Sequence, residues 1–258
     1  MDCGTTDRFS RTRLLLGDDG MKKLASARVL VIGLGAVGGF AVEALARSGV
    51  GHLKLIDCDK IAESNCNRQI YALTSTIGKP KAEVARERVL EINPACDVIS
   101  MVAFACNENF NELFEDENGP VDLVIDAIDS LNPKVDLLCA ALAKRIPIFS
   151  SMGAARRTDP SAIQVADISK TRYCPLARAM RARLHRRGIE SGVTCVYSAE
   201  PAPAGSFVPP EAEDIPERGR ARVVMGSLPT ITGIFGLTLA NTAISFIVGN
   251  DFSKRDRT

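Results

Sequence analysis

Three closely spaced glycines near the start of the chain have the spacing of a phosphate-binding loop. The segment reads Gly33-Leu34-Gly35-Ala36-Val37-Gly38 and stands between an apolar run and a helical pattern. Because glycine lacks a Cβ atom, backbone N–H groups and the positive end of the helix can approach a phosphate there. Asp57 ends the next apolar run nineteen residues after Gly38, a distance at which a carboxylate can accept hydrogen bonds from ribose hydroxyls. These residues predict a nucleotide site, and a purely structural tight turn is the alternative.

Cationic and amide side chains after Asp57 favour a triphosphate over a nicotinamide dinucleotide. Asp59, Asn65 and Arg68 follow closely, and Lys81 stands at the start of a helical pattern. A triphosphate carries about four negative charges and needs donors beyond the glycine loop. Arg68 offers a fork of N–H donors, and Lys81 occupies a helix position that disfavours cations. Solvated surface charge is the alternative interpretation of Arg68 and Lys81.

Two aspartates close a later apolar run, Val124-Ile125-Asp126-Ala127-Ile128-Asp129. Ligands of open α/β sheets lie outside the carboxyl ends of the strands. Magnesium binds there through one or two carboxylates together with substrate phosphates. Asp129 is therefore the predicted Mg²⁺ ligand. Asp126 and Ile128 complete the predicted nucleotide contacts, although Asp126 has the alternative of capping or pairing within the structure.

The elements that must position these side chains alternate along the first part of the chain. Strands are expected at 27–33, 52–59, 97–102, 121–127 and 146–151, and helices at 37–49, 79–91, 107–114 and 133–144. This alternation predicts an α/β fold with a doubly wound, Rossmann-like, mostly parallel sheet. After Gly153 the pattern changes to two strands that need not be parallel, an arginine-rich helix and a C-terminal apolar helix. We expect an ATP-binding part at 1–153 and a substrate and dimer-interface extension at 154–258, in one continuous domain with a mobile surface loop at 200–220.

Composition excludes several classes of protein. With 46% hydrophobic residues and a net charge of +1 over 258 residues, the chain is not expected to be disordered. Its first twenty residues are charged and hold no long apolar core, so we expect no secretory signal and a cytoplasmic location. The segment 223–250 has no charged residue, but its many Gly, Ser and Thr residues favour a buried core or interface helix over the alternative of membrane contact.

The eight cysteines include no CxxC pair. We therefore expect no zinc site and predict mostly buried free thiols. Cys195 lies in a strand-like run without a neighbouring cation, which favours a buried thiol, and a sulfur-accepting thiol is the alternative.

The segment 170–187 carries seven basic residues and no acidic one. A helix beginning near Pro175 would place Leu176, Met180 and Leu184 on one face and direct the arginines away from it. Such a surface can contact RNA phosphates. The alternatives are a solvated face or a protein partner. The RNA-binding candidates are Arg178, Arg181, Arg183, Arg186 and Arg187.

The motifs GLGAVG, LIDCD, NCNRQ, GKPKAE and IDAIDS, in this order and spacing, resemble the adenylating domain of ubiquitin-activating enzymes and their bacterial relatives over about 8–153. The resemblance implies ATP and magnesium, with attack of a carboxylate on the α-phosphate and release of pyrophosphate. By position it implies that Asp57 holds the ribose, that Asn65, Arg68 and Lys81 hold the phosphates, and that Asp129 holds the metal.

The same resemblance concerns two further positions. Arg11 is similar to an arginine that one protomer donates to the active site of the other, which implies a homodimer. Arg13 is a competing candidate, and an ordinary exposed arginine is the alternative. Ala36 stands where many relatives have a further glycine, which leaves only local geometry open.

The rest of the chain is similar to one branch of this family, the bacterial tRNA threonylcarbamoyladenosine dehydratases. The similar segments are GAARRTDPSAIQVADISKT, PLARAMRARL and GVTCVYSAE, whereas the carrier-protein branch usually has two CxxC pairs. This similarity implies adenylation and cyclisation of the threonylcarbamoyl carboxylate in tRNA. Activation of a ubiquitin-like sulfur carrier is the main alternative, and an NAD-binding oxidoreductase or an inactive nucleotide-binding module is a third. A cysteine desulfurase or SufE-like sulfur acceptor is a further candidate partner.

Overall fold

The computed structural model of the chain describes residues 7–116, 119–201, 205, 207–208 and 224–249. Its centre is a seven-stranded sheet with the order β3-β2-β1-β6-β7-β9-β8. Neighbouring strands are parallel except for the antiparallel pair β8 and β9. These strands are β1 (Arg28–Ile32), β2 (His52–Ile56), β3 (Asp97–Met101), β6 (Leu123–Asp126), β7 (Ile148–Ser151), β8 (Ile163–Asp167) and β9 (Thr194–Ser198). The predicted fold class is confirmed.

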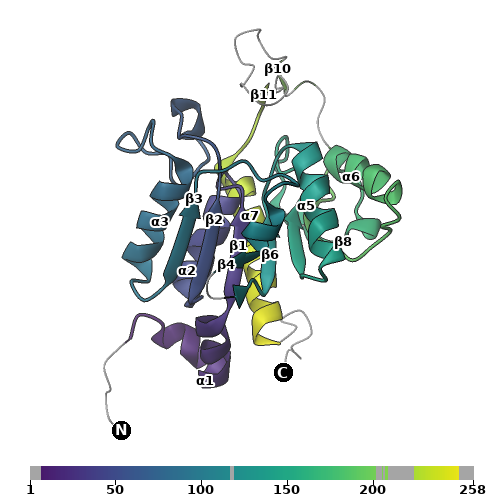
Figure 1. The fold of residues 1–258 in the computed structure, drawn as a ribbon. Helices are drawn as coiled ribbons and strands as arrows, with labels where there is room; N and C mark the ends of the chain where they lie inside the picture. The colour runs from purple at the N-terminus through teal and green to yellow at the C-terminus, as the bar shows by residue number, and fades with distance from the viewer. Residues whose placement is uncertain (1–6, 117–118, 202–204, 206, 209–223, 250–258) are drawn as a thin grey trace.

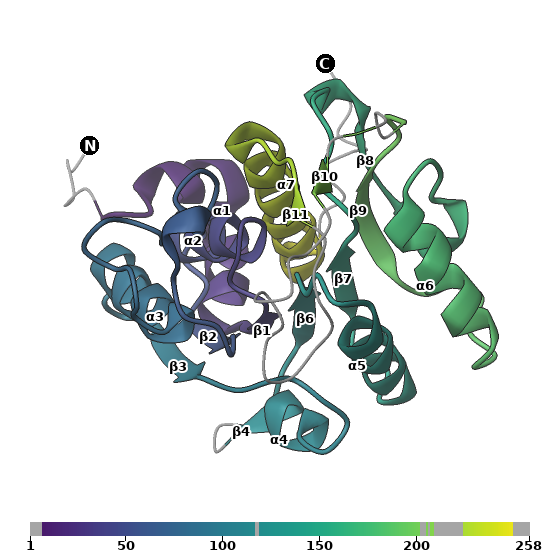
Figure 2. The same cartoon turned by 90° about the horizontal axis from the view of Figure 1, so that it is seen from above.

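Helices cover both faces of the sheet (Figure 2). The helices are α1 (Ser10–Ser26), α2 (Gly38–Ser48), α3 (Lys81–Ile92), α4 (Phe110–Phe114), α5 (Leu131–Ala143), α6 (Pro175–His185) and α7 (Pro229–Val248). One buried core joins α2, α3 and α7 to the sheet, and a second joins α4, α5 and α6 to its other face. Short elements complete the described chain: the 3₁₀ turns η1 (Glu63–Asn65), η2 (Pro160–Ala162) and η3 (Ile168–Lys170), and the strand pairs β4 (Glu115–Asp116) with β5 (Gly119–Pro120) and β10 (Phe207–Val208) with β11 (Val224–Met225).

Several predicted elements are longer than the observed ones, for local reasons. The strand predicted at 52–59 ends at Ile56, because the Asp57 carboxylate accepts the N–H of Asp59 and turns the chain. The helix predicted at 107–114 begins only at Phe110, because the Asn109 side chain accepts the N–H of Cys106 in a preceding turn.

The uncharged C-terminal segment forms α7, which packs closely against α2. A Cβ atom at Gly236 would lie 2.3 Å from the carbonyl oxygen of Val37, so only glycine permits this approach. By length and composition α7 could also cross a membrane. Residues of α7 that face the sheet, among them Phe235 and Leu239, are buried, which confirms the expected core helix. Leu237 and Phe246, also on α7, are about half exposed.

The sheet continues without a break across Gly153, because β9 pairs with β7. The functional division at this residue stays a prediction. The surface loop predicted at 200–220 lies for the most part outside the described residues.

Candidate nucleotide-binding site

The glycine loop (33–38) lies where the direction of the strand order reverses, between β1 and β6. The N–H of Gly33 donates to Ile56, and the N–H of Ala127 donates to Ile32, so the carboxyl ends of β2, β1 and β6 meet here. Gly33 has φ of 91°, and a Cβ atom on it would lie 2.7 Å from the carbonyl oxygen of Ala127. A Cβ atom on Gly38 would lie 1.7 Å from the carbonyl oxygen of Gly33. Both glycines are therefore required by close backbone packing.

Gly35 faces space that the protein leaves open. A Cβ atom there would meet only the Gln69 side chain, at 3.7 Å from its Nε2 atom. The backbone N–H groups of Gly35, Ala36 and Val37 donate to no other residue in the described part of the chain. They precede α2, whose N-cap residue Val37 supplies no side-chain cap. Unpaired amides at a helix N-terminus form an anion site.

Asp57 connects the end of β2 to the glycine loop. Its Oδ2 atom accepts the N–H of Leu34 at 2.6 Å, and its Oδ1 atom accepts the N–H of Asp59 at 2.8 Å. Burial raises the pKa of the Asp57 carboxyl, whereas Lys81 and the two N–H groups oppose this rise. Each carboxylate oxygen has a second lone pair that can accept a ribose hydroxyl.

Lys81 points into this site from the first position of α3. Its Nζ atom lies 2.9 Å from Asp59 Oδ2, and its side chain is only 7% exposed. This burial excludes the interpretation of Lys81 as a solvated surface charge. One potential metal-ligand atom from each of Asp57, Cys58 and Asp59 lies within 4.8 Å of the others. Burial is the first cause that raises the pKa of the Cys58 thiol, to about 11, so this group is protonated at neutral pH.

Arg68 and Asn65 lie in the turn around η1. Arg68 Nη1 donates to the carbonyl of Ser64 at 2.9 Å and to Asn67 Oδ1 at 2.8 Å. Asn65 Oδ1 accepts the N–H of Ala62 at 3.1 Å. Among the described residues, Arg68 Nη2 and the Asn65 amide nitrogen have no acceptor, so both can donate to a ligand.

Gln69 is a site residue that the sequence analysis missed as an individual position. Its side chain is 9% exposed and lies against Gly35, facing the same space as the unpaired amides. The motif NCNRQ contains this glutamine, but its contact with the loop depends on how the turn after η1 folds back. The structure thus adds an amide donor to the predicted set.

Asp126 and Asp129 have different environments although they are three residues apart. Asp126 is fully buried and accepts hydrogen bonds from Lys134 Nζ (2.8 Å), Ser150 Oγ (2.7 Å) and the N–H of Ile128 (3.1 Å). This burial and pairing favour the structural alternative for Asp126, since its side chain has no exposed surface to offer a ligand. Asp129 is exposed in the turn before α5 and accepts a hydrogen bond from Ser130 Oγ at 3.2 Å.

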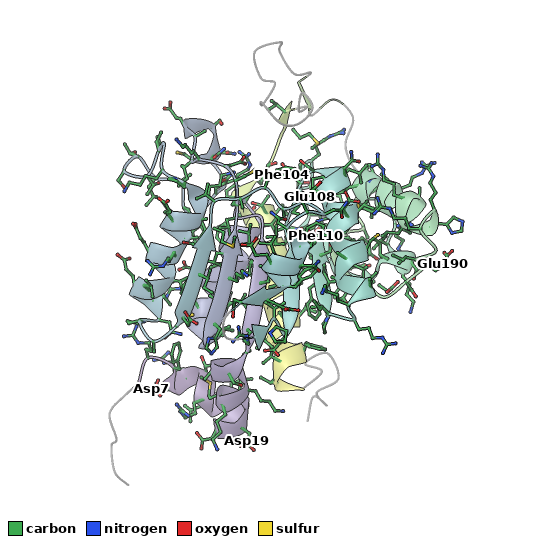
Figure 3. All side chains as sticks on the ribbon, in the orientation of Figure 1. Asp7, Asp19, Phe104, Glu108, Phe110 and Glu190 are labelled. Atoms are coloured by element: carbon green, nitrogen blue, oxygen red, sulfur yellow. The ribbon has the colours of Figure 1, made fainter. Side chains whose placement is uncertain are left out.

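The position of Arg11 separates it from this chain's own site. Asp7 and Asp19, which flank Arg11 along the chain, lie at the lower edge of the molecule, whereas Phe104, which follows β3, lies in the upper half (Figure 3). Arg13 is occupied by ion pairs with Asp7 at 2.9 Å and Asp18 at 2.8 Å. Arg11 is exposed and has no side-chain partner among the described residues.

Three of the arginines predicted to point away from the apolar stripe of α6 have acceptors within the fold, so their charges are not free as the RNA interpretation assumed. Arg181 donates to Thr171 and Ile168, Arg183 donates to Asn132, and Arg187 forms an ion pair with Asp136 at 2.7 Å. The buried stripe of α6 is narrow, so the long side chains beside it reach acceptors on η3 and α5. Arg178 and Arg186 are exposed and have no such partner within the described residues.

The cysteines divide between the core and the surface. Cys96, Cys174 and Cys195 are buried, and burial raises the pKa of the Cys195 thiol, as expected for a strand cysteine in the core. Cys58 and Cys66 are exposed, contrary to the general prediction of buried thiols. They lie in the connection after β2, which forms the rim of the nucleotide site rather than the core.

Comparison with known proteins identifies the class to which this fold and site belong. Residues 9–257 match the ThiF family, and the chain belongs to it. The chain is 44% identical over 193 residues to the tRNA threonylcarbamoyladenosine dehydratase of Bacillus subtilis, covering 75% of each protein. It is 36% identical over 250 residues to the Escherichia coli enzyme of the same name, covering 92% of each.

Comparison with solved structures also finds a tRNA threonylcarbamoyladenosine dehydratase. The chain superimposes on the crystal structure of E. coli tRNA N6-threonylcarbamoyladenosine dehydratase in complex with ATP with a TM-score of 0.81 and 34% identity, covering 94% of each chain.

Proposed function

We propose that this protein is an ATP-dependent dehydratase that adenylates the carboxylate of threonylcarbamoyladenosine in tRNA and then cyclises it. The observation that carries the nucleotide half is the row of unpaired amides at 35–37, next to Leu34, whose N–H donates to Asp57. The similarity to dehydratases over nearly the whole chain supports the substrate half.

The site residues divide the binding of ATP among them. The glycine loop and the N-terminus of α2 bind phosphate, and the Asp57 carboxylate accepts the ribose hydroxyls. Asn65, Arg68 and Lys81 donate to the remaining phosphate oxygens, with Gln69 beside Gly35. These three donors, two of them positively charged, offset part of the charge of the triphosphate when water is excluded.

Magnesium fits the exposed carboxylate in the turn before α5. Asp129 follows the carboxyl end of β6 and is exposed to the solvent, and carboxylate oxygens are the ligands that a hard cation prefers. Asp129 would hold the ion, which would neutralise charge on the phosphates when bound. Asp57 and Asp59 lie in the other acidic group of the site but are engaged with backbone amides and Lys81.

The proposed reaction needs no nucleophilic side chain. A carboxylate oxygen of the substrate attacks the α-phosphorus, the bond to the bridging oxygen breaks, and pyrophosphate leaves. An atom of the same threonylcarbamoyl side chain then attacks the acyl carbon, gives up its proton and expels AMP, which keeps the carboxylate oxygen. The side chain thereby loses one water and closes to a hydantoin or oxazolone. Because the attacking atom is tethered, the enzyme must chiefly position groups and exclude water, and the coupling of ATP cleavage to bond formation is that of a ligase.

The functional unit that we propose is a homodimer in which Arg11 of one protomer completes the site of the other. Leu14 and Leu15, on the same turn of α1, are 89% and 66% exposed. Adjacent exposed leucines at a helix surface are typical of an interface. The location of α1 at the edge opposite the glycine loop supports a role of Arg11 in the site of a second copy rather than in that of its own chain (Figure 1).

Arg178 and Arg186 are the RNA-contacting residues that we propose from the predicted set, because their charges are not used within the described fold. His185, the neighbour of Arg186, is paired with Glu190 at 2.5 Å. A cytoplasmic location accords with a tRNA substrate. A sulfur-acceptor protein stays a candidate partner on the strength of the resemblance alone.

The test is incubation of the protein with ATP, Mg²⁺ and tRNA that carries the open threonylcarbamoyl group, followed by mass analysis of the nucleosides. We expect a nucleoside lighter by one water, together with AMP and pyrophosphate. Absence of this product, combined with adenylation of a carrier protein ending in Gly-Gly, would establish the alternative of sulfur-carrier activation. Binding of NAD in preference to ATP would refute both.

A further inference from the structure

A buried lysine ties together the turn that carries Asp129. Lys134, in the second turn of α5, is fully buried, and so is the carboxylate of Asp126 with which it pairs at 2.8 Å. The same Nζ atom donates to the carbonyl oxygen of Ile128 at 3.0 Å. One ammonium group therefore bridges the end of β6 and the middle of the β6–α5 turn (127–130).

The other bonds of this cluster close the turn from both ends. Asp126 Oδ1 accepts the N–H of Ile128 at 3.1 Å, while Ser150 on β7 donates to Asp126 Oδ2 at 2.7 Å. The backbone N–H of Lys134 donates to the carbonyl of Ser130 at 3.2 Å. The exposed Asp129 lies between these anchored positions, so the backbone that carries its carboxylate is held in place.

The turn also supports the glycine loop. The carbonyl oxygen of Ala127 lies 2.7 Å from the position that a Cβ atom of Gly33 would take, and the Cβ atom of Ala127 lies 3.2 Å from the corresponding position on Gly38. A shift of the turn would therefore be transmitted to the loop by direct backbone contact.

A buried ion pair is a poor source of net stability, because the desolvation of both charges offsets their attraction and an apolar pair often serves as well. A role in fixing geometry is a better explanation of its presence beside a site whose chemistry depends on positioned charge. We propose that Lys134 is a positioning residue, which acts through Asp126 and Ile128 to hold Asp129 in the orientation that binds the metal of the Mg²⁺–ATP complex. This inference rests on the proposed function.

The main test is the double variant Asp126→Asn/Lys134→Met, which removes both charges together and so avoids an unpaired buried carboxylate. The introduced amide can still accept the N–H of Ile128 and bond to the hydroxyl of Ser150, whereas the tie to the Ile128 carbonyl is lost. Calorimetric titration with AMP, and with ATP over a series of Mg²⁺ concentrations, reports on the site without tRNA. We expect AMP affinity within about threefold of the native value, and a rise of about 10- to 100-fold in the Mg²⁺ concentration that half-saturates ATP binding.

Lys54 provides a matched control. It is another buried lysine, and its Nζ atom donates to the carbonyls of Glu112 and Glu115 at 2.7 and 2.8 Å, outside the candidate site. Lys54→Met should lower thermal stability without changing the Mg²⁺ requirement, and Lys134→Arg should retain most of the native Mg²⁺ requirement.

The proposal is overturned if the folded double variant has the native Mg²⁺ requirement, or if Lys54→Met changes that requirement equally. An unchanged Mg²⁺ requirement in Asp129→Ala overturns it as well. Failure of the wild-type protein to dehydrate tRNA would instead refute the proposed function. The two failures can be told apart, because the nucleotide and Mg²⁺ titrations do not involve tRNA.

Discussion

Alanine at Gly33 and alanine at Gly35 should damage the protein in different ways. At Gly33 the new methyl group would lie 2.7 Å from the Ala127 carbonyl oxygen, and the backbone has φ of 91°. A left-handed conformation costs an L-residue about 1–2 kcal/mol, and overpacking of a rigid contact costs about 1–3 kcal/mol. We therefore expect Gly33→Ala to lower the free energy of unfolding by about 2–5 kcal/mol, and the melting temperature by about 4–20 °C for a domain of this size.

At Gly35 the methyl group would meet only the Gln69 side chain at an ordinary contact distance, so the fold should tolerate it. The free energy of unfolding should change by less than about 1 kcal/mol. The methyl group would nevertheless occupy space that a phosphate must enter to reach the unpaired amides. We expect ATP affinity to fall at least about tenfold, a loss of about 1.4 kcal/mol.

The assays are thermal or urea unfolding, followed by calorimetric titration of each folded variant with ATP. Native stability of Gly33→Ala would show that the turn at Ala127 yields easily and that the close packing does not require glycine. Native ATP affinity of Gly35→Ala would show that phosphate does not approach the loop at this residue, and the anion site would then lie elsewhere.

Three further predictions concern charge. Lys81→Met removes a cation that lowers the pKa of Asp57, so the pKa of that carboxyl should rise further. As the pH is lowered, ATP binding should then be lost at a higher pH than in the native protein. An unshifted pH profile of ATP affinity would contradict this. Arg11→Ala and Asp129→Ala should each abolish dehydration. Mixing the two variants should restore part of the activity through heterodimers that hold one complete site. No recovery after subunit exchange would argue against donation of Arg11 between protomers. Arg178→Ala should raise KM for tRNA several-fold and reduce its dependence on salt, with ATP affinity unchanged, and an equal salt dependence would exclude a phosphate contact.

Much of the nucleotide site could be predicted because its signals are local. Glycine spacing, the alternation of apolar runs and the acid at the end of β2 each depend on a few consecutive residues. Lys81 was noted only as an unusual cation at a helix start; its burial and its pair with Asp59 at 2.9 Å became visible in the structure. Gln69 was missed because its value as a donor depends on a fold-back of the chain toward Gly35.

The basic segment shows the limit of this kind of prediction. Its charge count was correct, but three of the five arginines selected for RNA are bound to acceptors elsewhere in the fold. Arg187, for example, pairs with Asp136, fifty-one residues earlier in the chain (187 − 136). A helical pattern shows which residues leave the buried stripe, but the acceptors on neighbouring elements determine whether their charges are free.

By itself the sequence determined the class of fold, the phosphate loop and the order of the chemical motifs, because backbone conformation and side-chain periodicity act over short stretches of chain. Only the tertiary structure showed that Asp126 is buried and paired, since its partners are Lys134 on α5 and Ser150 on the neighbouring strand β7. It also placed α1, which carries Arg11, at the edge opposite the glycine loop (Figure 1). Burial and pairing are properties of residues brought together from distant positions, and the folded chain alone brings them together.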